Sequence, residues 1–247
     1  MSIGIEGKCR RRGRILRGLA AMAFGLGLLS LGFVNDAAAF SAANVYRQAS
    51  PSVVLIFGFD DSGQGSSGTG SIISRDGLVL TNNHVIANAE TKRLHPNLVV
   101  YFKPQPISGD NRKDLKKPYL VDVIAHDAEL DLALLRVKQP PAGLQPIAIG
   151  DSEEVDIGES VAAIGHPGGG GLWTLTTGTV SSKRQDQQRD IFQTDTAINP
   201  GSSGGPLVTL AGVWVGVNTA TLRDSEGLGF SVPSSQVRKF LARVLSD

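Results

Sequence analysis

A glycine-rich segment near the C-terminal end of the chain has the residues needed for nucleophilic chemistry. Residues 201–205 read G-S-S-G-G and fit the pattern G-x-S-G-G. A serine that attacks a carbonyl must stand clear of the backbone, and the oxyanion it creates needs N–H donors already directed at it. The flanking glycines permit both, because they adopt backbone angles closed to other residues and let a substrate chain pass close by. The same residues are also common in ordinary loops, so other segments must decide.

Two upstream segments offer the base and the acid that such a serine requires. His84 lies in T-N-N-H-V, directly after the apolar run L-V-L at 78–80, which places it at the exit of a predicted strand. Asp131 directly precedes L-A-L-L, the start of a second predicted strand. Both side chains can therefore face a cleft at the end of a strand.

Together, T-N-N-H-V, D-L-A-L-L and Q-T-D-x-x-I-N-P-G-x-S-G-G-P resemble the protease domain of the HtrA (Deg) family of trypsin-like serine proteases. The order His, Asp, Ser is that of the trypsin-like double barrel and differs from the subtilisin and α/β-hydrolase orders. The resemblance runs from about Tyr46 to the C-terminal helix. It implies that His84 is the general base, Asp131 its orienting acid and Ser203 the nucleophile. The N–H groups of Gly201 and Ser203 would form the oxyanion hole.

Several neighbouring residues compete for these roles. Asp127 and Glu129 are alternative acids, but only Asp131 begins D-L-A-L-L. Ser202 is the alternative nucleophile, but the two glycines must follow the attacking serine. Asp195 is interpreted as a turn or capping residue. Three further histidines are interpreted as structural or solvated: His95, His126 and His166.

The resemblance also implies a pocket for the residue before the scissile bond. The residues expected to bind substrate are Ala197, Ile198, Gly227, Leu228, Gly229 and Phe230, with further wall around Val217 and Asn218. Ala197, six residues before Ser203, would form the base and is apolar, which predicts cleavage after Val, Ala or Ile and not after basic residues. Asp224 and Glu226 lie nearby and would weaken this preference. The segment 227–230 is expected to be an edge strand that pairs with the substrate backbone.

Some features depart from the relatives. Ser202 replaces the aspartate of zymogen-activated trypsins, so removal of an N-terminal segment need not be an activation step. HtrA proteins usually carry PDZ domains after the protease, and none follows here before Asp247, so capture through PDZ domains is not assumed. The loop predicted at 183–190 is short, and 168–171 is either a mobile activation loop or a plain turn. The resemblance implies trimers held by a segment around 40–45.

Residues 1–39 have the pattern of a secretory signal peptide. A basic head precedes an apolar run from Gly18 to Val34, and three alanines at 37–39 offer a cleavage site that leaves Phe40 first. The alternative is an uncleaved anchor, although the run is short for a membrane span. The arginines leave a twin-arginine export route open, but Gly13 interrupts the usual arrangement. We expect an extracytoplasmic protein, periplasmic or secreted.

Composition narrows the function classes. The chain has 247 residues, of which 41% are hydrophobic and 30 are glycine. Removing residues 1–39, with six Lys/Arg and two acidic residues, leaves 18 basic and 21 acidic residues and a net charge of about −3. No basic stripe for nucleic acid remains. Cys9 is the only cysteine, so the exported part has no disulfide, and no metal-ligand cluster is visible. We predict no cofactor, and polypeptides as the partners.

Short strands separated by Gly and Pro turns predict an all-β fold. The first six strands are expected at 52–58, 68–74, 78–82, 98–102, 119–125 and 132–137, and the second six at 160–165, 172–181, 191–194, 206–210, 213–218 and 229–232. The motifs favour two six-stranded antiparallel barrels, at about 50–138 and 145–233, with the site in the cleft between them. Helices are expected at 42–49 and 235–245, the latter capped by Ser234 and docked on the second barrel.

Two functions remain from different classes. The first is an exported endopeptidase that acts on unfolded or damaged proteins through an acyl-enzyme on Ser203. The second is a catalytically silent, chaperone-like module that holds peptides in the cleft. An intact set of three catalytic side chains favours the first. A glutamate-specific bacterial relative of the same fold is a third reading.

Overall fold

The computed structural model describes residues 41–168, 170–186, 189–219 and 227–246, all within one compact unit, Ala37–Asp247. The predicted signal peptide and the two acids Asp224 and Glu226 lie outside the described residues. Within the described ranges, no helix is both long and apolar enough to cross a membrane.

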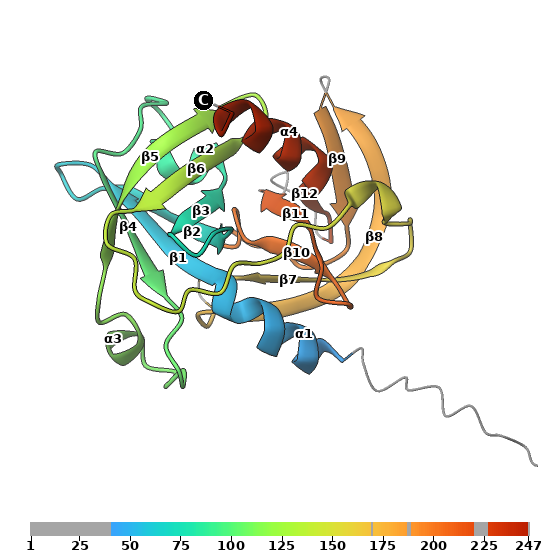
Figure 1. Cartoon of the computed structure of the whole chain (residues 1–247), viewed down its shortest axis with the longest axis horizontal. Coiled ribbons are helices and arrows are strands. Elements are labelled where there is room, and N and C mark those ends of the chain that lie inside the picture. Colours follow the sequence, from blue (N-terminus) through green and yellow to red (C-terminus); the bar gives the residue numbers. More distant parts are fainter. Residues whose placement is uncertain (1–40, 169, 187–188, 220–226, 247) are drawn as a thin grey trace, which may run out of the picture. The chain divides into compact units, whose positions relative to one another are not determined.

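The first barrel contains the residues of the predicted base and acid. Its strands are β1 (Val53–Phe59), β2 (Gly65–Ile72), β3 (Leu78–Thr81), β4 (Asn97–Phe102), β5 (Tyr119–Asp127) and β6 (Leu132–Val137). They close in the order β1-β2-β3-β6-β5-β4, and every pair is antiparallel (Figure 1). Inward-facing aliphatic side chains such as Ile56, Ile72 and Leu135 fill its interior.

The second barrel contains the predicted nucleophile loop. Its strands are β7 (Ser160–Gly165), β8 (Thr174–Asp186), β9 (Arg189–Thr194), β10 (Pro206–Thr209), β11 (Trp214–Thr219) and β12 (Gly229–Pro233). They close in the order β10-β11-β12-β9-β8-β7, again antiparallel. The predicted fold of two six-stranded barrels is therefore confirmed, and all twelve strands lie where the sequence placed them to within a few residues.

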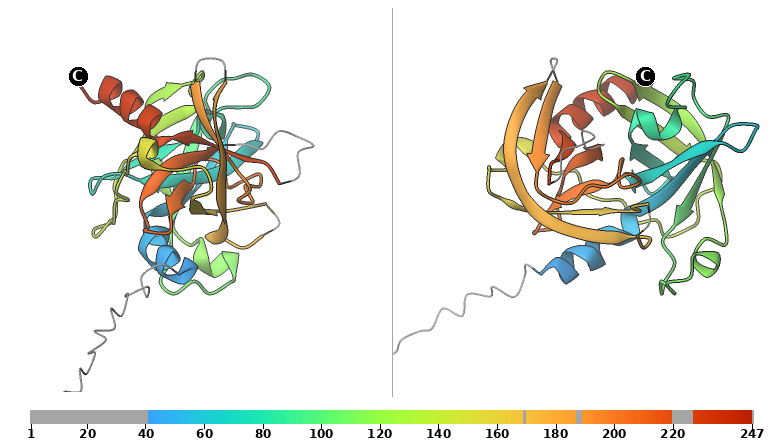
Figure 2. Two further views of the ribbon diagram at one scale, coloured as in Figure 1. Left: turned by 90° about the vertical axis from the view of Figure 1, so that its right-hand side faces the viewer. Right: turned by 180° about the vertical axis from the view of Figure 1, so that it is seen from behind.

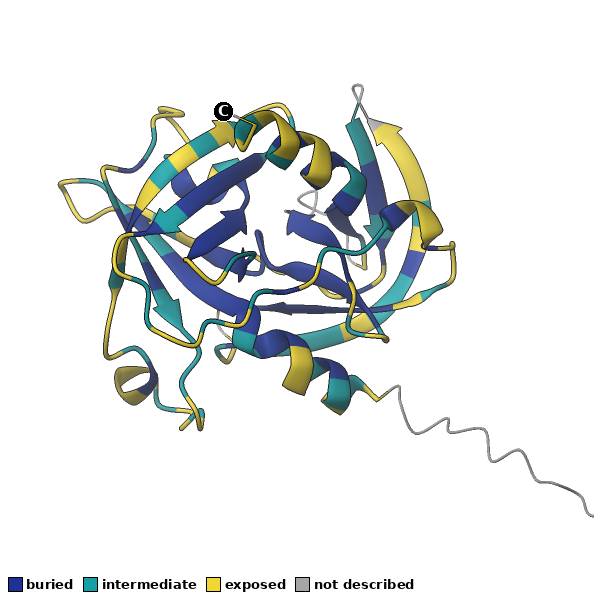
Figure 3. Ribbon diagram, in the orientation of Figure 1, coloured by how far each residue is buried: buried dark blue, intermediate teal, exposed yellow. Residues whose placement is uncertain are grey.

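One hydrophobic cluster joins the barrels. It contains Leu80 and Leu134 from the first barrel, Ile164 and Trp214 from the second, and Trp173 between β7 and β8. The Trp173 indole N–H donates to the carbonyl of Val53 at 2.8 Å, so the ring also links the barrels by a hydrogen bond. Figure 3 shows the buried strands facing each other across this region.

Two longer helices cover the outside of the barrels. Helix α1 (Ala42–Ala49) is capped by Ser41 and continues into a 3₁₀ turn, η2 (Ser50–Ser52). Helix α4 (Ser234–Val244) packs its apolar face on β11 and β12, as predicted, with Val237 and Phe240 buried. The short elements are α2 (Asn83–Ile86), α3 (Asn111–Asp114) and η3 (Ser152–Glu154).

Three local expectations were wrong. Ser234 is not the N-cap of α4 but its first residue, because Pro233 ends β12 and the hydroxyl of Ser152 accepts the N–H of Ser235 at 2.9 Å instead. The predicted loop 183–190 is largely strand, since β8 and β9 continue to Asp186 and Arg189 in a long hairpin (Figure 2). Phe230 is not on an edge, because it pairs with Thr219 of β11 on one side and with Gln193 of β9 on the other.

Candidate active site

His84 and Asp131 meet at the end of the first barrel. Strands β3 and β6 pair with Thr81 opposite Ala133, so the residues just beyond them are neighbours. His84 lies on α2, and its Nδ1 is 2.8 Å from Asp131 Oδ2 and 3.1 Å from Oδ1. The backbone N–H of His84 also donates to Oδ1 at 3.0 Å. Because a carboxylate only accepts, Nδ1 carries the hydrogen, and Nε2 of the neutral ring is left to take a proton.

Asp131 is held by two residues to which the sequence analysis gave no role. The hydroxyl of Thr219, from the second barrel, donates to Asp131 Oδ2 at 2.8 Å. The side-chain amide of buried Asn82 donates to the Asp131 carbonyl at 2.8 Å. Asp131 has φ 54°, a left-handed conformation that few non-glycine residues adopt. A threonine at a strand end gives no signal in the sequence, whereas Asn82 lies inside T-N-N-H-V and could have been weighed.

Asp127 and Asp195 form hydrogen bonds with other parts of the chain. Asp127 accepts the N–H groups of Glu129 and Leu130 and forms an ion pair with Arg243. These groups hold its pKa below the ordinary value although burial opposes them. Asp195 accepts the N–H of Thr179, consistent with the structural role expected for it.

Ser203 lies on the loop between β9 and β10, against the His84 helix. Its carbonyl accepts the N–H of Thr69 at 2.8 Å. A Cβ added to Gly68 would lie 2.5 Å from Val85 Cγ2 and 3.1 Å from Ser203 O, so Ser203 and the residue after His84 flank the same glycine. No hydrogen bond joins Ser203 Oγ to His84 within the described residues. Such bonds are often long in unliganded enzymes and tighten when substrate binds.

Most of the backbone N–H and C=O groups of the nucleophile loop form hydrogen bonds. The carbonyls of residues 200–203 accept, in order, from Gly168 N, Thr69 Oγ1, Gly205 N and Thr69 N. The N–H groups of Ser202, Gly204 and Gly205 donate to Asn199, Asn218 and Ser202. Within the described residues, the N–H groups of Gly201 and Ser203 have no such acceptor. These are the two donors predicted for the oxyanion hole, and Gly201 has φ 97°, which favours glycine.

The predicted specificity residues fall into two groups. Buried Ile198 packs on Gly229, where an added Cβ would lie 2.9 Å from Ile198 Cδ1. Ala197 is exposed, and its carbonyl accepts the hydroxyl of Thr176 at 2.9 Å. Gly227 is exposed and Leu228 half-buried, beside the part of the chain that is not described. The structure therefore brings Ile198 and Gly229 together.

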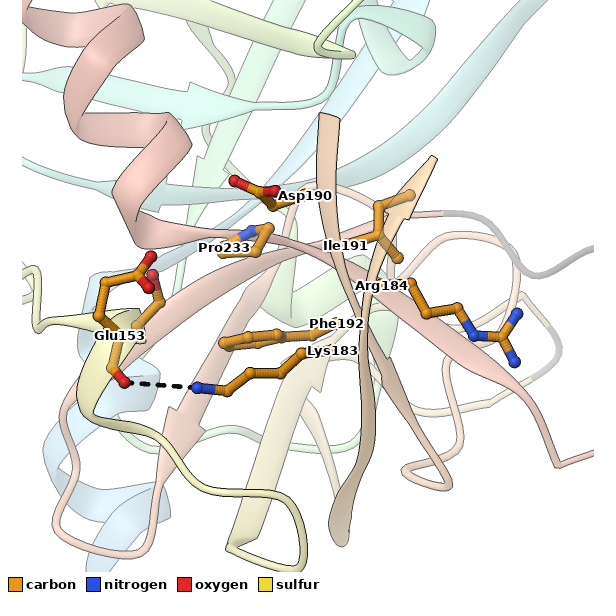
Figure 4. Close-up of a pocket in the computed structure, with 8 residues that line it drawn as sticks. Glu153, Lys183, Arg184, Asp190, Ile191, Phe192 and Pro233 are labelled. Carbon is orange, nitrogen blue, oxygen red and sulfur yellow. Dashed lines mark hydrogen bonds between the residues drawn. The ribbon is translucent and has the colours of Figure 1, made fainter. Parts of the chain in front are cut away.

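The hollow beside His84 is large enough for substrate side chains. It measures about 560 Å³, and its walls include His84, Asp131 and Thr219 as well as Lys92 and Arg189. A second hollow of about 240 Å³ lies on the outer side of the second barrel, where Lys183 lies along the Phe192 ring and donates to the carbonyl of Glu153 (Figure 4). Among the described residues, no group of three or more His, Cys, Asp or Glu could hold a metal ion.

The buried histidine beside the nucleophile loop is neutral. His166 is 4% exposed, and burial lowers its pKa to about 3. Its ring packs edge-on against Trp173, with the ring centroids 4.8 Å apart. His95 is also buried and lies 3.1 Å from Ser66 Oγ, whereas exposed His126 lies 3.0 Å from Asn83 Oδ1.

Comparison with known proteins places this site in a family. Residues 68–217 match the family model described as a trypsin-like peptidase domain. The chain is 38% identical over 183 residues to the magnetosome formation protease MamE of Paramagnetospirillum magneticum, covering 70% of this chain and 23% of that protein. It is 35% identical over 188 residues to a probable periplasmic serine endoprotease, DegP-like, of Chlamydia pneumoniae, covering 73% and 34%.

A solved structure of an HtrA-type protease has a similar fold. The HtrA-type protease AlgW with tripeptide superposes with a TM-score of 0.69 at 31% identity, covering 83% of this chain and 64% of that one. The double barrel and its site thus define a trypsin-like serine peptidase. Within that class, the chain belongs to the HtrA (Deg) family, as its motifs predicted. The chain spans about a quarter to a third of the length of these two curated relatives.

Proposed function

We propose that the chain is an exported serine endopeptidase that cleaves polypeptides through an acyl-enzyme on Ser203. The observation that carries this is the arrangement around the nucleophile loop. His84 and Asp131 form a hydrogen-bonded pair, and the N–H groups of Gly201 and Ser203 have no acceptor in the part of the chain that the structure describes. The proposed domain spans residues 40–247, after a signal peptide at 1–39.

The chemistry follows from these positions. His84 Nε2 takes the proton of Ser203 Oγ while Oγ bonds to the scissile carbonyl carbon. The carbonyl oxygen becomes an oxyanion and accepts from Gly201 N and Ser203 N. The C–N bond then breaks, and the amine leaves with the proton from Nε2. Water gives a proton to the same nitrogen as it attacks the acyl carbon, the C–Oγ bond breaks to release the acid, and Ser203 Oγ takes the proton back from Nε2. Asp131 stabilises the imidazolium in both halves.

The substrate preference and the location of the protein are supported by separate observations. The apolar contact of Ile198 with Gly229 supports small or medium aliphatic residues before the scissile bond. The curated relative from Chlamydia pneumoniae is named periplasmic, which supports an extracytoplasmic location for this chain as well. Unfolded or damaged proteins as substrates, and assembly into trimers, are inferred from the family alone.

Fluorophosphonate labelling tests the reaction, because this reagent modifies only an activated serine. The chain from Phe40 should gain one adduct by intact mass, Ser203→Ala none, and His84→Ala and Asp131→Asn much less. Labelling that survives in Ser203→Ala would assign the wrong nucleophile. No labelling of the parent chain, with or without unfolded protein added, would favour the peptide-binding module.

A pair of peptides tests the specificity. Peptides that differ only in Val or Arg before the scissile bond should be cleaved with a kcat/KM that favours Val by at least about tenfold, since one apolar contact is worth 10- to 200-fold. Cleavage that favours Arg would show that an acid forms the base of the pocket, and would reject the aliphatic assignment.

A further inference from the structure

Thr69 connects the first barrel to the nucleophile loop by two hydrogen bonds. It lies in β2 and is fully buried. Its N–H donates to the carbonyl of Ser203 at 2.8 Å, and its hydroxyl donates to the carbonyl of Gly201 at 2.7 Å. Its own carbonyl accepts the hydroxyl of Thr81 at 2.7 Å, which anchors it within its barrel.

His166 makes two contacts with the Thr69 hydroxyl oxygen. The backbone N–H of His166 lies 3.2 Å from Thr69 Oγ1, and its ring Nδ1 lies 2.9 Å from the same oxygen. The hydroxyl has one hydrogen, and a carbonyl can only accept, so that hydrogen goes to Gly201 O. Nδ1 must then be protonated and donate to Thr69. The other ring nitrogen, Nε2, is left as a bare acceptor and has no partner in the described part of the chain.

The Gly201 carbonyl is a sensitive point for catalysis. It belongs to the peptide group between residues 201 and 202. The two peptide groups on either side of it carry the N–H groups of Gly201 and Ser203, which have no acceptor among the described residues. Rotation of the middle peptide changes the backbone angles of both residues that join it to its neighbours. Gly201 offers little resistance to such rotation, because glycine has the widest range of backbone angles.

We propose that Thr69 is a positioning residue for peptide hydrolysis, which holds the Gly201 carbonyl so that both N–H groups face the oxyanion, with His166 fixing its hydroxyl. This inference rests on the proposed function, because it assigns those two N–H groups to the transition state. Thr69 itself touches neither the substrate nor the reacting atoms. Its effect should therefore appear in kcat, while substrate binding is left intact.

The test compares three threonine variants of the chain from Phe40. Thr69→Val removes the hydroxyl, and Thr69→Ser keeps it. Thr209→Val is the matched control, because Thr209 is also buried but its hydroxyl has no partner among the described residues. Active sites are counted by fluorophosphonate titration, so that misfolded molecules do not enter kcat. Thr69→Ala, which adds no methyl group toward the Gly201 carbonyl, serves if Thr69→Val does not fold.

We expect Thr69→Val to lower kcat by about 10- to 100-fold, somewhat less than the loss of an oxyanion donor itself, with KM changed by less than about twofold. The Ki of a peptide boronate, whose tetrahedral adduct places an oxygen between the two donors, should rise by a similar factor. Thr69→Ser and Thr209→Val should retain kcat within about threefold. A Thr69→Val enzyme with wild-type kcat, or a loss confined to KM, would overturn the inference.

His166→Phe tests the second part of the proposal. It keeps a ring beside Trp173 and the backbone N–H that donates to Thr69, but it loses the ring Nδ1 donor. A fall in kcat that is smaller than that of Thr69→Val is expected, whereas no fall or a larger one would contradict the assigned role. If the parent chain neither labels nor cleaves, the proposed function fails instead, so the two failures are separate.

Discussion

Asp131 has a rare backbone conformation, and the side-chain amide of Asn82 is one of the groups that bind it. Asn82 donates to its carbonyl at 2.8 Å, and the carboxylate then reaches both the ring and the backbone N–H of His84. We expect Asn82→Ala to lower kcat by about tenfold, because displacing a catalytic group by a fraction of an ångström is costly. Since it removes one hydrogen bond from the half-buried Asp131, the free energy of unfolding should fall by about 1 kcal/mol.

Peptide hydrolysis and urea unfolding measure these two effects. Asn111→Ala, at the exposed first position of α3, is the matched control and should change neither. An Asn82→Ala enzyme that keeps wild-type kcat would show that Asp131 needs no such anchor.

The sequence carries a local signal for the proposed reacting residues but none for the threonines that support them. His84, Asp131 and Ser203 lie in motifs whose neighbours have a local physical purpose. Thr69 and Thr219 look like any other strand residue, and their partners lie 132 and 88 positions away in the chain. No local pattern carries that information, because the contacts exist only once the two barrels have formed.

At the scale of elements, α4 is attached by one face. Phe240 is 1% exposed and packs in the cluster that joins the barrels, whereas Leu245, beyond the end of the helix, is 51% exposed. We expect Phe240→Ala to lower the free energy of unfolding by about 3–5 kcal/mol. Leu245→Ala should change it by less than about 0.5 kcal/mol. Urea denaturation measures both, and equal effects would show that the helix is not docked as described.

The predicted element boundaries match the structure where apolar residues alternate in the sequence, and they differ from it where apolar residues do not alternate. Strand β8 extends to Asp186 through K-R-Q-D, which is too polar to read as a strand but pairs with β9 in an exposed hairpin. The N-terminus of α4 was misplaced because its cap, Ser152, is 83 residues away in the chain. Local patterns predicted the twelve strands and the two longer helices but not the short helical turns, and the ends of β8 and α4 depend on contacts with distant residues.

At the scale of the whole molecule, His166 makes stability depend on pH. Burial lowers its pKa from 6.5 to about 3, so between these values the unfolded chain binds a proton there and the folded chain does not. The free energy of unfolding therefore falls as the pH decreases below about 6.5, and this contribution is fully retained above it. At pH 5 the loss from His166 should be about 2 kcal/mol relative to pH 8.

The matched variant isolates this contribution from that of the carboxylates. Phenylalanine at position 166 binds no proton in either the folded or the unfolded state. Between pH 8 and pH 5, the free energy of unfolding of His166→Phe should therefore fall by about 2 kcal/mol less than that of the parent chain. Urea unfolding at the two pH values measures the difference. Identical pH dependence in the two proteins would show that His166 is protonated alike in both states.

The cluster shared by the barrels should make them unfold together. Both tryptophans of the chain, Trp173 and Trp214, lie in this cluster, and Trp214 belongs to the second barrel. Leu135 lies in the separate interior of the first barrel. We expect Leu135→Ala, which should cost about 2–5 kcal/mol, to shift the urea midpoint of tryptophan fluorescence as much as that of far-UV circular dichroism. If the barrels were independent, the fluorescence midpoint would stay at its wild-type value and the dichroism would show two steps.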